Sequence, residues 1–128
     1  MSAKNTFVLA GILVLVLIVF SLIWYWTGAG SGKPNPALDS FAMCLRDKQV
    51  TMYGAYWCSH CQNEKRAFGD SFRFVPYVEC TRETAKCAAA GIEGFPTWIF
   101  PDGRKLVGEQ GLRRISQESG CPYENQKL

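Results

Sequence analysis

The chain has 128 residues, a formal net charge of +3 and six cysteines. This length is enough for one small domain with an appendage. The basic residues are dispersed among acidic ones, so Arg104-Lys105 and Arg113-Arg114 indicate solvated faces, and no nucleic-acid partner is expected. Six cysteines in so short a chain favour an oxidising compartment.

The first predicted element is an apolar run, Phe7–Trp26, of twenty residues without a charge. Its length matches one membrane-spanning helix, and it closes on the interfacial aromatic residues 24–26. A cleavable signal peptide is the alternative, because Thr27-Gly28-Ala29 offers small residues, but the run exceeds a usual signal h-region. We therefore expect an uncleaved single-pass anchor in membrane lipid, with residues 1–6 as a cytoplasmic stub and the domain on the extracytoplasmic side.

The rest of the chain predicts a tether, one small α/β domain and a tail. Residues 27–36 are rich in Gly and Pro and predict a flexible linker, 37–122 form the domain, and 123–128 form a frayed tail. Within the domain the apolar periodicity predicts the order α-β-α-β-α-β-β-α about a central mixed sheet. The helices are expected at 38–45, 58–68, 81–90 and 110–119, and the strands at 50–56, 72–79, 97–100 and 105–107.

Three local signals refine these elements. Asp39 or Ser40 is expected near the cap of the first domain helix, because short polar side chains accept hydrogen bonds from unpaired backbone N–H groups there. Pro76 cannot donate to a sheet, so its strand is expected at an edge or with an irregularity. Pro101-Asp102-Gly103 predicts a tight turn between the last two strands.

The most informative motif is Cys58-Ser59-His60-Cys61, which joins a predicted strand to a predicted helix. The spacing allows the two thiols to close a small disulfide ring. It also places the first sulfur at a helix start, where free N–H groups and the helix dipole favour a thiolate. Because the thiolate is the reactive form of cysteine, Cys58 is predicted to be a nucleophile.

The spacing of these cysteines also allows other uses. The pair could form a structural disulfide, or it could join Cys80 and Cys87 in a four-thiolate zinc site. No metal is expected, because the pair sits at an exposed helix start. A c-type haem is excluded, because His60 lies between the two cysteines.

Three blocks of sequence carry a resemblance to a known family. Gly94-Phe95-Pro96-Thr97, following a strand–CxxC–helix unit, resembles thioredoxin. With it, the blocks Tyr53–Gln62, Tyr77–Cys80 and Gly91–Trp98 resemble the thioredoxin-like domain that is fused to, or works with, vitamin K epoxide reductase homologues in bacteria and chloroplasts. The resemblance covers nearly all of 38–120. It implies a compact thioredoxin fold.

The resemblance also implies a role for each residue of the motif. Cys58 would form the mixed disulfide with a partner protein, and Cys61 would resolve it. His60 is placed as in the Cys-Pro-His-Cys of strongly oxidising DsbA-like proteins, where it would stabilise the Cys58 thiolate, although an exposed loop residue is the alternative. Ser59 replaces the proline of many relatives, so their redox potential does not carry over.

The substrate side of the site is implied in the same way. Pro96 should be cis and, with Thr97, face the active-site disulfide. Phe95 would offer backbone groups to an extended client segment. Trp57 would shield the disulfide and shape the docking surface.

One position departs from thioredoxin. Thioredoxin has a buried acid six residues before its first active-site cysteine, and Met52 stands there in this chain. Glu79, at the end of the next predicted strand, is a candidate substitute, with a structural or solvated role as the alternative.

The remaining four cysteines are expected to form structural disulfides. The resemblance implies that Cys80 pairs with Cys87, which requires their helix to start late, near Thr84, because helical positions seven apart are about 10 Å from each other. Cys44 and Cys121 would then pair and pin the first domain helix to the C-terminus. Other connectivities, such as one that joins Cys44 to Cys80, remain open.

These observations predict a membrane-anchored, extracytoplasmic thiol–disulfide oxidoreductase that oxidises dithiols of exported proteins. A separate quinone-linked membrane oxidase, similar to a vitamin K epoxide reductase homologue or to DsbB, is expected to reoxidise it. No cofactor is expected beyond the Cys58–Cys61 disulfide. The alternatives are a disulfide reductase or isomerase, and a non-catalytic redox-sensing or binding module.

Overall fold

The computed structural model describes residues 3–27 and 35–124, with side chains at 7–25 and 35–124. The chain divides into two units, residues 1–32 and 33–128, and each is described by itself. The start of the predicted stub (1–2), most of the predicted linker (28–34) and the end of the predicted tail (125–128) lie outside the described residues.

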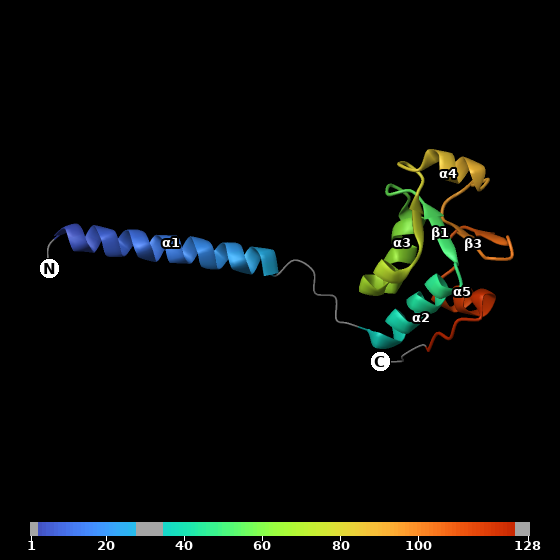
Figure 1. The fold of residues 1–128 in the computed structure, drawn as a ribbon, viewed down its shortest axis with the longest axis horizontal. Helices are drawn as coiled ribbons and strands as arrows, with labels where there is room; N and C mark the ends of the chain where they lie inside the picture. Colours follow the sequence, from blue (N-terminus) through green and yellow to red (C-terminus); the bar gives the residue numbers. More distant parts are fainter. Residues whose placement is uncertain (1–2, 28–34, 125–128) are drawn as a thin grey trace. The chain divides into compact units, whose positions relative to one another are not determined.

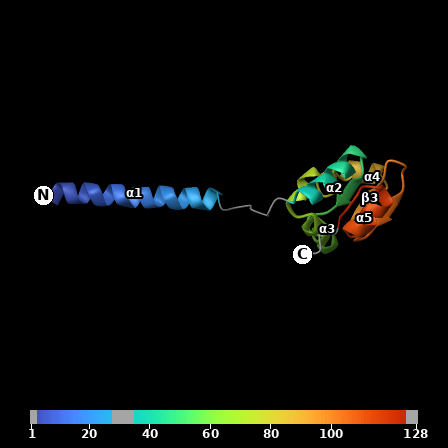
Figure 2. The ribbon, with the colours of Figure 1, turned by 90° about the horizontal axis from the view of Figure 1, so that it is seen from below.

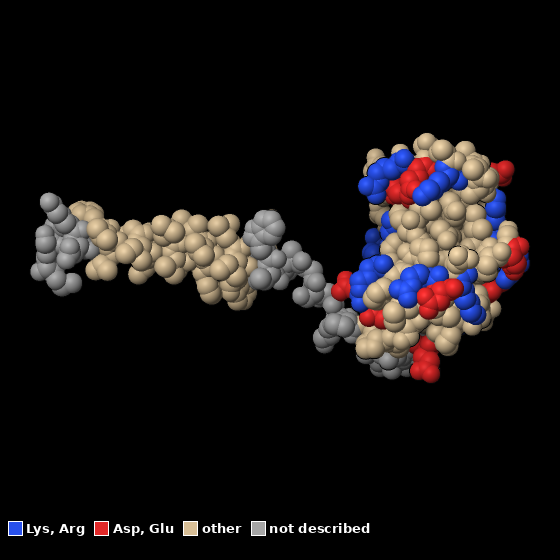
Figure 3. Space-filling view, viewed as in Figure 1, with Lys and Arg blue, Asp and Glu red and all other residues tan. Residues whose placement is uncertain are grey.

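The N-terminal unit contains one helix, α1 (Ala3–Thr27). Its stretch Phe7–Tyr25 is long and apolar enough to cross a membrane. The coloured surface of this helix carries no charged side chain in the view of Figure 3. A helix pairs its own backbone N–H and C=O groups, as a span in lipid requires. The predicted apolar span is therefore one uninterrupted helix.

The described residues of the second unit form four α-helices and a four-stranded sheet in the predicted order, and Figure 1 shows their arrangement. Strand β1 pairs parallel with β2 and antiparallel with β3, and β3 pairs antiparallel with β4, giving the spatial order β2-β1-β3-β4. The predicted α/β class with a mixed sheet is confirmed. The helices are α2 (Pro36–Asp47), α3 (Ser59–Phe68), α4 (Thr84–Ala89) and α5 (Leu112–Ser119), and the strands are β1 (Thr51–Gly54), β2 (Tyr77–Glu79), β3 (Thr97–Ile99) and β4 (Lys105–Val107).

Figure 2 shows the helices of this unit arranged around its strands. Apolar side chains from the sheet and from these helices form one core. Met52 of β1 and Trp98 of β3 are cross-strand partners, and both are fully buried. Phe68 of α3 packs on Trp98 and stacks on Phe41 of α2, with ring centroids 6.1 and 5.6 Å apart. Helix α3 therefore covers one face of the sheet, and its first turn is held at the end of β1.

The cap of α2 differs from the prediction. Asn35 is the N-cap, because its side-chain oxygen accepts the backbone N–H of Leu38 at 3.2 Å, and Pro36 occupies the first helical position. An Asn followed by Pro is a favoured helix start, since proline lacks an N–H group that would go unpaired there. Asp39 lies inside the helix instead, where its carboxylate accepts hydrogen bonds from Ser71 and Arg73.

The predicted strand 72–79 is only partly correct. Residues Gly69–Phe74 form a 3-10 helix, η1, and the strand β2 begins after Pro76. Phe72 packs edge-on against Phe68 and Tyr77, so the apolar residues of this segment fill the core from a helical turn. Strand β2 lies at an edge of the sheet, as Pro76 indicated.

Two other helices begin later than predicted. Helix α4 starts at Thr84 instead of residue 81, after a turn in which Arg82 N–H donates to the carbonyl of Glu79. Helix α5 starts at Leu112 instead of residue 110, because Gly111 has a positive φ of 75° that does not belong to a right-handed helix.

Candidate active site

The Cys58-Ser59-His60-Cys61 motif lies where β1 passes into α3. Cys58 is the N-cap of α3, with extended backbone angles, and its sulfur accepts the N–H of Cys61 at 3.4 Å. Free N–H groups and the positive end of the helix dipole surround a sulfur in this position. The sulfur of Cys58 therefore caps the first turn of α3.

The two sulfurs of the motif differ in access. Cys58 is 7% exposed and Cys61 is 0% exposed, and both are free thiols. Burial, together with the hydrogen bond to Cys58, raises the pKa of Cys61 to about 12, against smaller lowering effects of the Ala55 backbone and of Lys65. An incoming sulfur can therefore reach Cys58 but not Cys61, which lies behind it.

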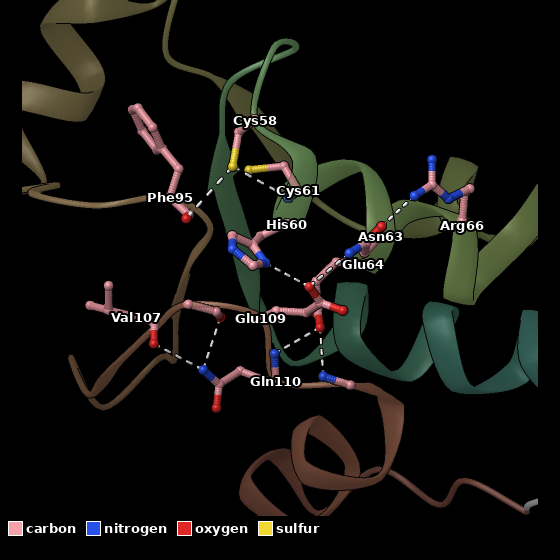
Figure 4. Close-up of polar contacts among 12 residues, drawn as sticks. Cys58, His60, Cys61, Asn63, Glu64, Arg66, Phe95, Val107, Glu109 and Gln110 are labelled. Atoms are coloured by element: carbon pink, nitrogen blue, oxygen red, sulfur yellow. Dashed lines mark hydrogen bonds and ion pairs between the residues drawn. The ribbon is translucent and has the colours of Figure 1, made fainter.

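The segment that carries Phe95 and Pro96 faces Cys58 (Figure 4). The Phe95–Pro96 peptide bond is cis, and the Cys58 thiol donates to the Phe95 carbonyl at 3.7 Å. Trp57, which is 61% exposed, meets the Phe95 ring edge-on with centroids 5.9 Å apart. Thr97 is buried, and its hydroxyl donates to the carbonyl of Gly94 at 2.8 Å, so it shapes this loop from within.

The imidazole of His60 is exposed and pairs with a residue that the sequence analysis did not identify. Its Nδ1 lies 2.8 Å from Oε2 of Glu109, in the loop before α5, and Asn63 donates to the same oxygen at 3.0 Å (Figure 4). The hydrogen bond from His60, followed by that from Asn63, lowers the pKa of Glu109. This pair places the Glu109 carboxylate directly beside the imidazole of His60.

A second unidentified residue, Glu64, holds the loop of Glu109 in place. Glu64 is 1% exposed and accepts hydrogen bonds from the indole of Trp98 at 2.9 Å and from the N–H groups of Gln110 and Gly111 at 2.8 and 2.5 Å. Three donors satisfy this buried carboxylate. A signal was available in the sequence, since positions 61, 64 and 68 share the buried side of α3.

Glu79 has a structural role at the end of β2. Its carboxylate accepts hydrogen bonds from the Tyr77 hydroxyl at 2.6 Å, the Thr81 hydroxyl at 2.7 Å and the Tyr56 N–H at 3.2 Å. Burial alone would raise the pKa of Glu79, but these donors outweigh it and lower the pKa. The Glu79 carboxylate thus links the end of β2 to the residues that follow β1. Met52 is apolar, so the position of the thioredoxin acid carries no carboxylate in this chain.

The other four cysteines form two disulfides. One joins Cys44 of α2 to Cys121 beyond α5, and the other joins Cys80 after β2 to Cys87 of α4, with Cα–Cα distances of 5.8 and 5.7 Å. The late start of α4 allows the second pairing. The disulfide between Cys80 and Cys87 also argues against the zinc alternative, because bonded sulfurs are not available as thiolate ligands. Within the residues described, no group of three or more His, Cys, Asp or Glu could hold a metal ion.

Comparison with known proteins identifies a relative that is informative about the site. No protein-family model matches the sequence. The chain is 38% identical over 99 residues to a protein of Arabidopsis thaliana named thiol-disulfide oxidoreductase LTO1. The match covers 70% of this chain and 26% of that protein, so the chain spans about a quarter of its length.

Proposed function

We propose that this chain is a thiol–disulfide oxidoreductase that exchanges its Cys58–Cys61 disulfide with cysteines of other proteins. The observation that carries the proposal is the asymmetry of the two sulfurs, one reachable at a helix N-cap and one buried behind it. A relative named as an enzyme of this class, 38% identical to the chain, supports it.

The exchange proceeds by two sulfur displacements. A client thiolate attacks Cys58 of the disulfide, the Cys58–Cys61 bond breaks, and Cys61 leaves as a thiolate that takes up a proton. A second client thiolate then attacks the client sulfur of the mixed disulfide and Cys58 leaves. The client loses two electrons, which the Cys58–Cys61 dithiol now holds.

The direction that we favour is oxidation of dithiols in exported proteins. The absence of the thioredoxin acid at Met52 supports an oxidant, and so does His60, whose imidazolium form would stabilise the Cys58 thiolate. Stabilising the reduced form makes the disulfide a stronger oxidant. A reductase or isomerase supplied with electrons from inside the cell is the competing direction.

The site of action that we propose is the extracytoplasmic face of a membrane, with α1 as a single-pass anchor and the N-terminus inside. The apolar stretch Phe7–Tyr25 supports an anchor. Two disulfides outside the redox motif support an oxidising compartment. A membrane oxidase resembling a vitamin K epoxide reductase homologue or DsbB would accept the two electrons from each cycle.

Trapping tests the proposed function. In the full chain, Cys61→Ser removes the sulfur that would displace a bound client from Cys58, so mixed disulfides formed when the Cys58 thiolate attacks client disulfides should accumulate, and reduction should release them. The matched control is Cys58→Ser, which should trap nothing. If Cys61→Ser also traps nothing, the chain is a binding or sensing module instead of an exchange enzyme.

The redox potential of Cys58–Cys61 decides the direction. A value nearer the −120 mV of DsbA is expected for an oxidant, whereas a value near the −270 mV of thioredoxin would support the reductase. Equilibration of the purified full chain with glutathione of known poise gives this value.

A further inference from the structure

We propose that the ammonium group of Lys65, held by the ring of Tyr77, stabilises the negative charge on the Cys61 sulfur whenever Cys61 attacks or leaves. The inference rests on the proposed function and deepens it. It adds a positioning residue outside the CxxC motif and outside the Phe95-Pro96 segment.

Cys61 needs such a partner because of where its sulfur lies. The thiol is fully buried, and burial opposes the charged form. The strand behind it has Met52 at the position where thioredoxin carries an acid, so no carboxylate of β1 can take its proton. Glu79, on β2, already accepts hydrogen bonds from Tyr77, Thr81 and Tyr56.

The cysteine and Tyr77 share one small space beside Gly54. A Cβ atom added to Gly54 would lie 2.9 Å from the Cys61 sulfur, 3.2 Å from a carbon of the Tyr77 ring and 3.3 Å from its hydroxyl. Only glycine fits here without displacing one of them. The hydrogen bond from Tyr77 to Glu79, at 2.6 Å, fixes the ring in this place.

Lys65 reaches the same ring from α3. It lies four residues after Cys61, so both project from the same side of the helix. Its Nζ is 3.6 Å from the centroid of the Tyr77 ring and 5.5 Å from that of Phe72. A cation over an aromatic face at this distance is held by cation–π attraction. None of the ion pairs among the described residues uses Lys65.

The charged and titratable groups around Cys61 are therefore few. Cys58 lies at the N-cap of the same helix, and Tyr77 of β2 shares the space beside Gly54 and binds Glu79 through its hydroxyl. Lys65 is the cation over the Tyr77 ring. Lys65 lowers the pKa of Cys61 against the effect of burial, as expected for a nearby cation. Burial of Tyr77, together with its bond to Glu79, raises its pKa, so the hydroxyl keeps its proton and adds no negative charge.

The effect is the same in both directions of exchange. Cys61 carries negative charge when it leaves the disulfide and when it attacks Cys58, since the two steps pass through one transition state. Lys65 would thus assist an oxidase and a reductase equally. The inference does not depend on the redox direction.

The test separates the two sulfurs within one reaction. The reduced full chain in detergent is mixed with an aromatic disulfide whose released thiolate is coloured. In the first phase the Cys58 thiolate displaces one aromatic thiolate and forms a mixed disulfide. In the second phase the Cys61 thiol loses its proton to solvent, and the resulting thiolate attacks the Cys58 sulfur and displaces the other aromatic thiolate. The dithiol is oxidised and the reagent is reduced by two electrons.

Lys65→Met keeps the apolar stem but removes the charge. We expect the second phase to slow by about threefold to tenfold and the first phase to keep its rate, because a one-unit rise in pKa cuts the thiolate fraction tenfold and partly raises its nucleophilicity. Lys65→Arg should restore the second phase. High salt should slow the second phase of the unaltered chain more than that of Lys65→Met.

Arg66→Met is the matched control, since it removes one positive charge from the next position of α3. The Arg66 guanidinium donates to the side chain of Asn63, and the cation over the Tyr77 ring is that of Lys65, so both phases should keep their rates. The inference is overturned if Lys65→Met leaves the second phase unchanged, if it slows both phases alike, or if Arg66→Met slows the second phase as much. Lys65→Gln answers the same question if Lys65→Met does not fold. A chain that shows no second phase before any substitution contradicts the proposed function instead.

Discussion

The parallel strands β1 and β2 are each followed by a pair of cysteines, at the same end of the sheet. The two pairs differ in whether their cysteines are free or bonded to each other. After β1, Cys58 and Cys61 are free and Cys58 retains access to solvent. After β2, Cys80 and Cys87 are bonded to each other. The strand ends are adjacent, because Gly54 pairs with Glu79 in the register and Cys80 N–H donates to the Gly54 carbonyl at 2.8 Å.

The difference arises from where each helix begins. Helix α3 starts directly after Cys58, so its first sulfur lies at the helix N-cap with N–H groups around it. Helix α4 starts at Thr84, and the intervening turn folds Cys80 back onto Cys87. The position of the helix start therefore distinguishes Cys58 from Cys80, since the two side chains are buried to a similar extent.

The largest expected effect separates the two pairs by chemistry. Cys58→Ala should reduce disulfide exchange by about three orders of magnitude or more, because it removes the nucleophile. Replacing both Cys80 and Cys87 by Ala should leave exchange in place and lower the free energy of unfolding by roughly 2–3 kcal/mol, the chain-entropy value for so short a loop. Client oxidation and denaturant unfolding measure the two results. Loss of exchange in the second variant would show that both pairs take part in the chemistry.

The close packing of the Cys61 sulfur against the end of β1 can be tested at Gly54. Gly54→Ala would bring a Cβ within 2.9 Å of the Cys61 sulfur, so one of the two must move. We expect a loss of stability of about 1–3 kcal/mol, as for other over-packed core positions, together with slower release of mixed disulfides. Thermal unfolding and single-turnover exchange measure these effects. Unchanged stability would mean that Cys61 has free space on the sheet side.

The smallest expected effect concerns the hydrogen bonds that the Glu79 carboxylate accepts at the end of β2. Glu79→Gln should cost about 1–2 kcal/mol at pH 7, because the amide accepts fewer of the hydrogen bonds that the carboxylate accepts. The folded pKa of Glu79 is lowered, so its contribution is complete above the unfolded pKa of about 4.3 and is lost as pH falls through the folded pKa.

Unfolding of both forms as a function of pH checks the sign. The stability difference between the unaltered chain and Glu79→Gln should be largest near neutral pH and shrink in acid. A difference that grows in acid would mean that Glu79 is protonated in the folded protein, which would make it a candidate proton donor to the site.

The sequence by itself determined the features whose causes are local. The apolar run Phe7–Trp26, the Cys58–Cys61 spacing at a helix start and the alternation of periods are near-neighbour patterns, and the order of helices and strands follows from them. The N-cap Asn35 was equally readable, since Asn followed by Pro is a local signal. The partner of each of the other four cysteines was not determined, because four cysteines allow three connectivities.

Only the tertiary structure decided which distant residues meet. Glu64 binds the backbone of Gln110 and Gly111, and Glu109 pairs with His60, across 46 to 49 positions of sequence. Lys65 and Tyr77 meet because α3 covers the face of the sheet on which β2 carries the tyrosine. Such contacts depend on strand order and register, and a carboxylate or an ammonium group has no periodicity that reveals its partner. The cysteines that we propose as reactive could therefore be identified from the sequence, whereas the charged groups around them were identified only from the fold.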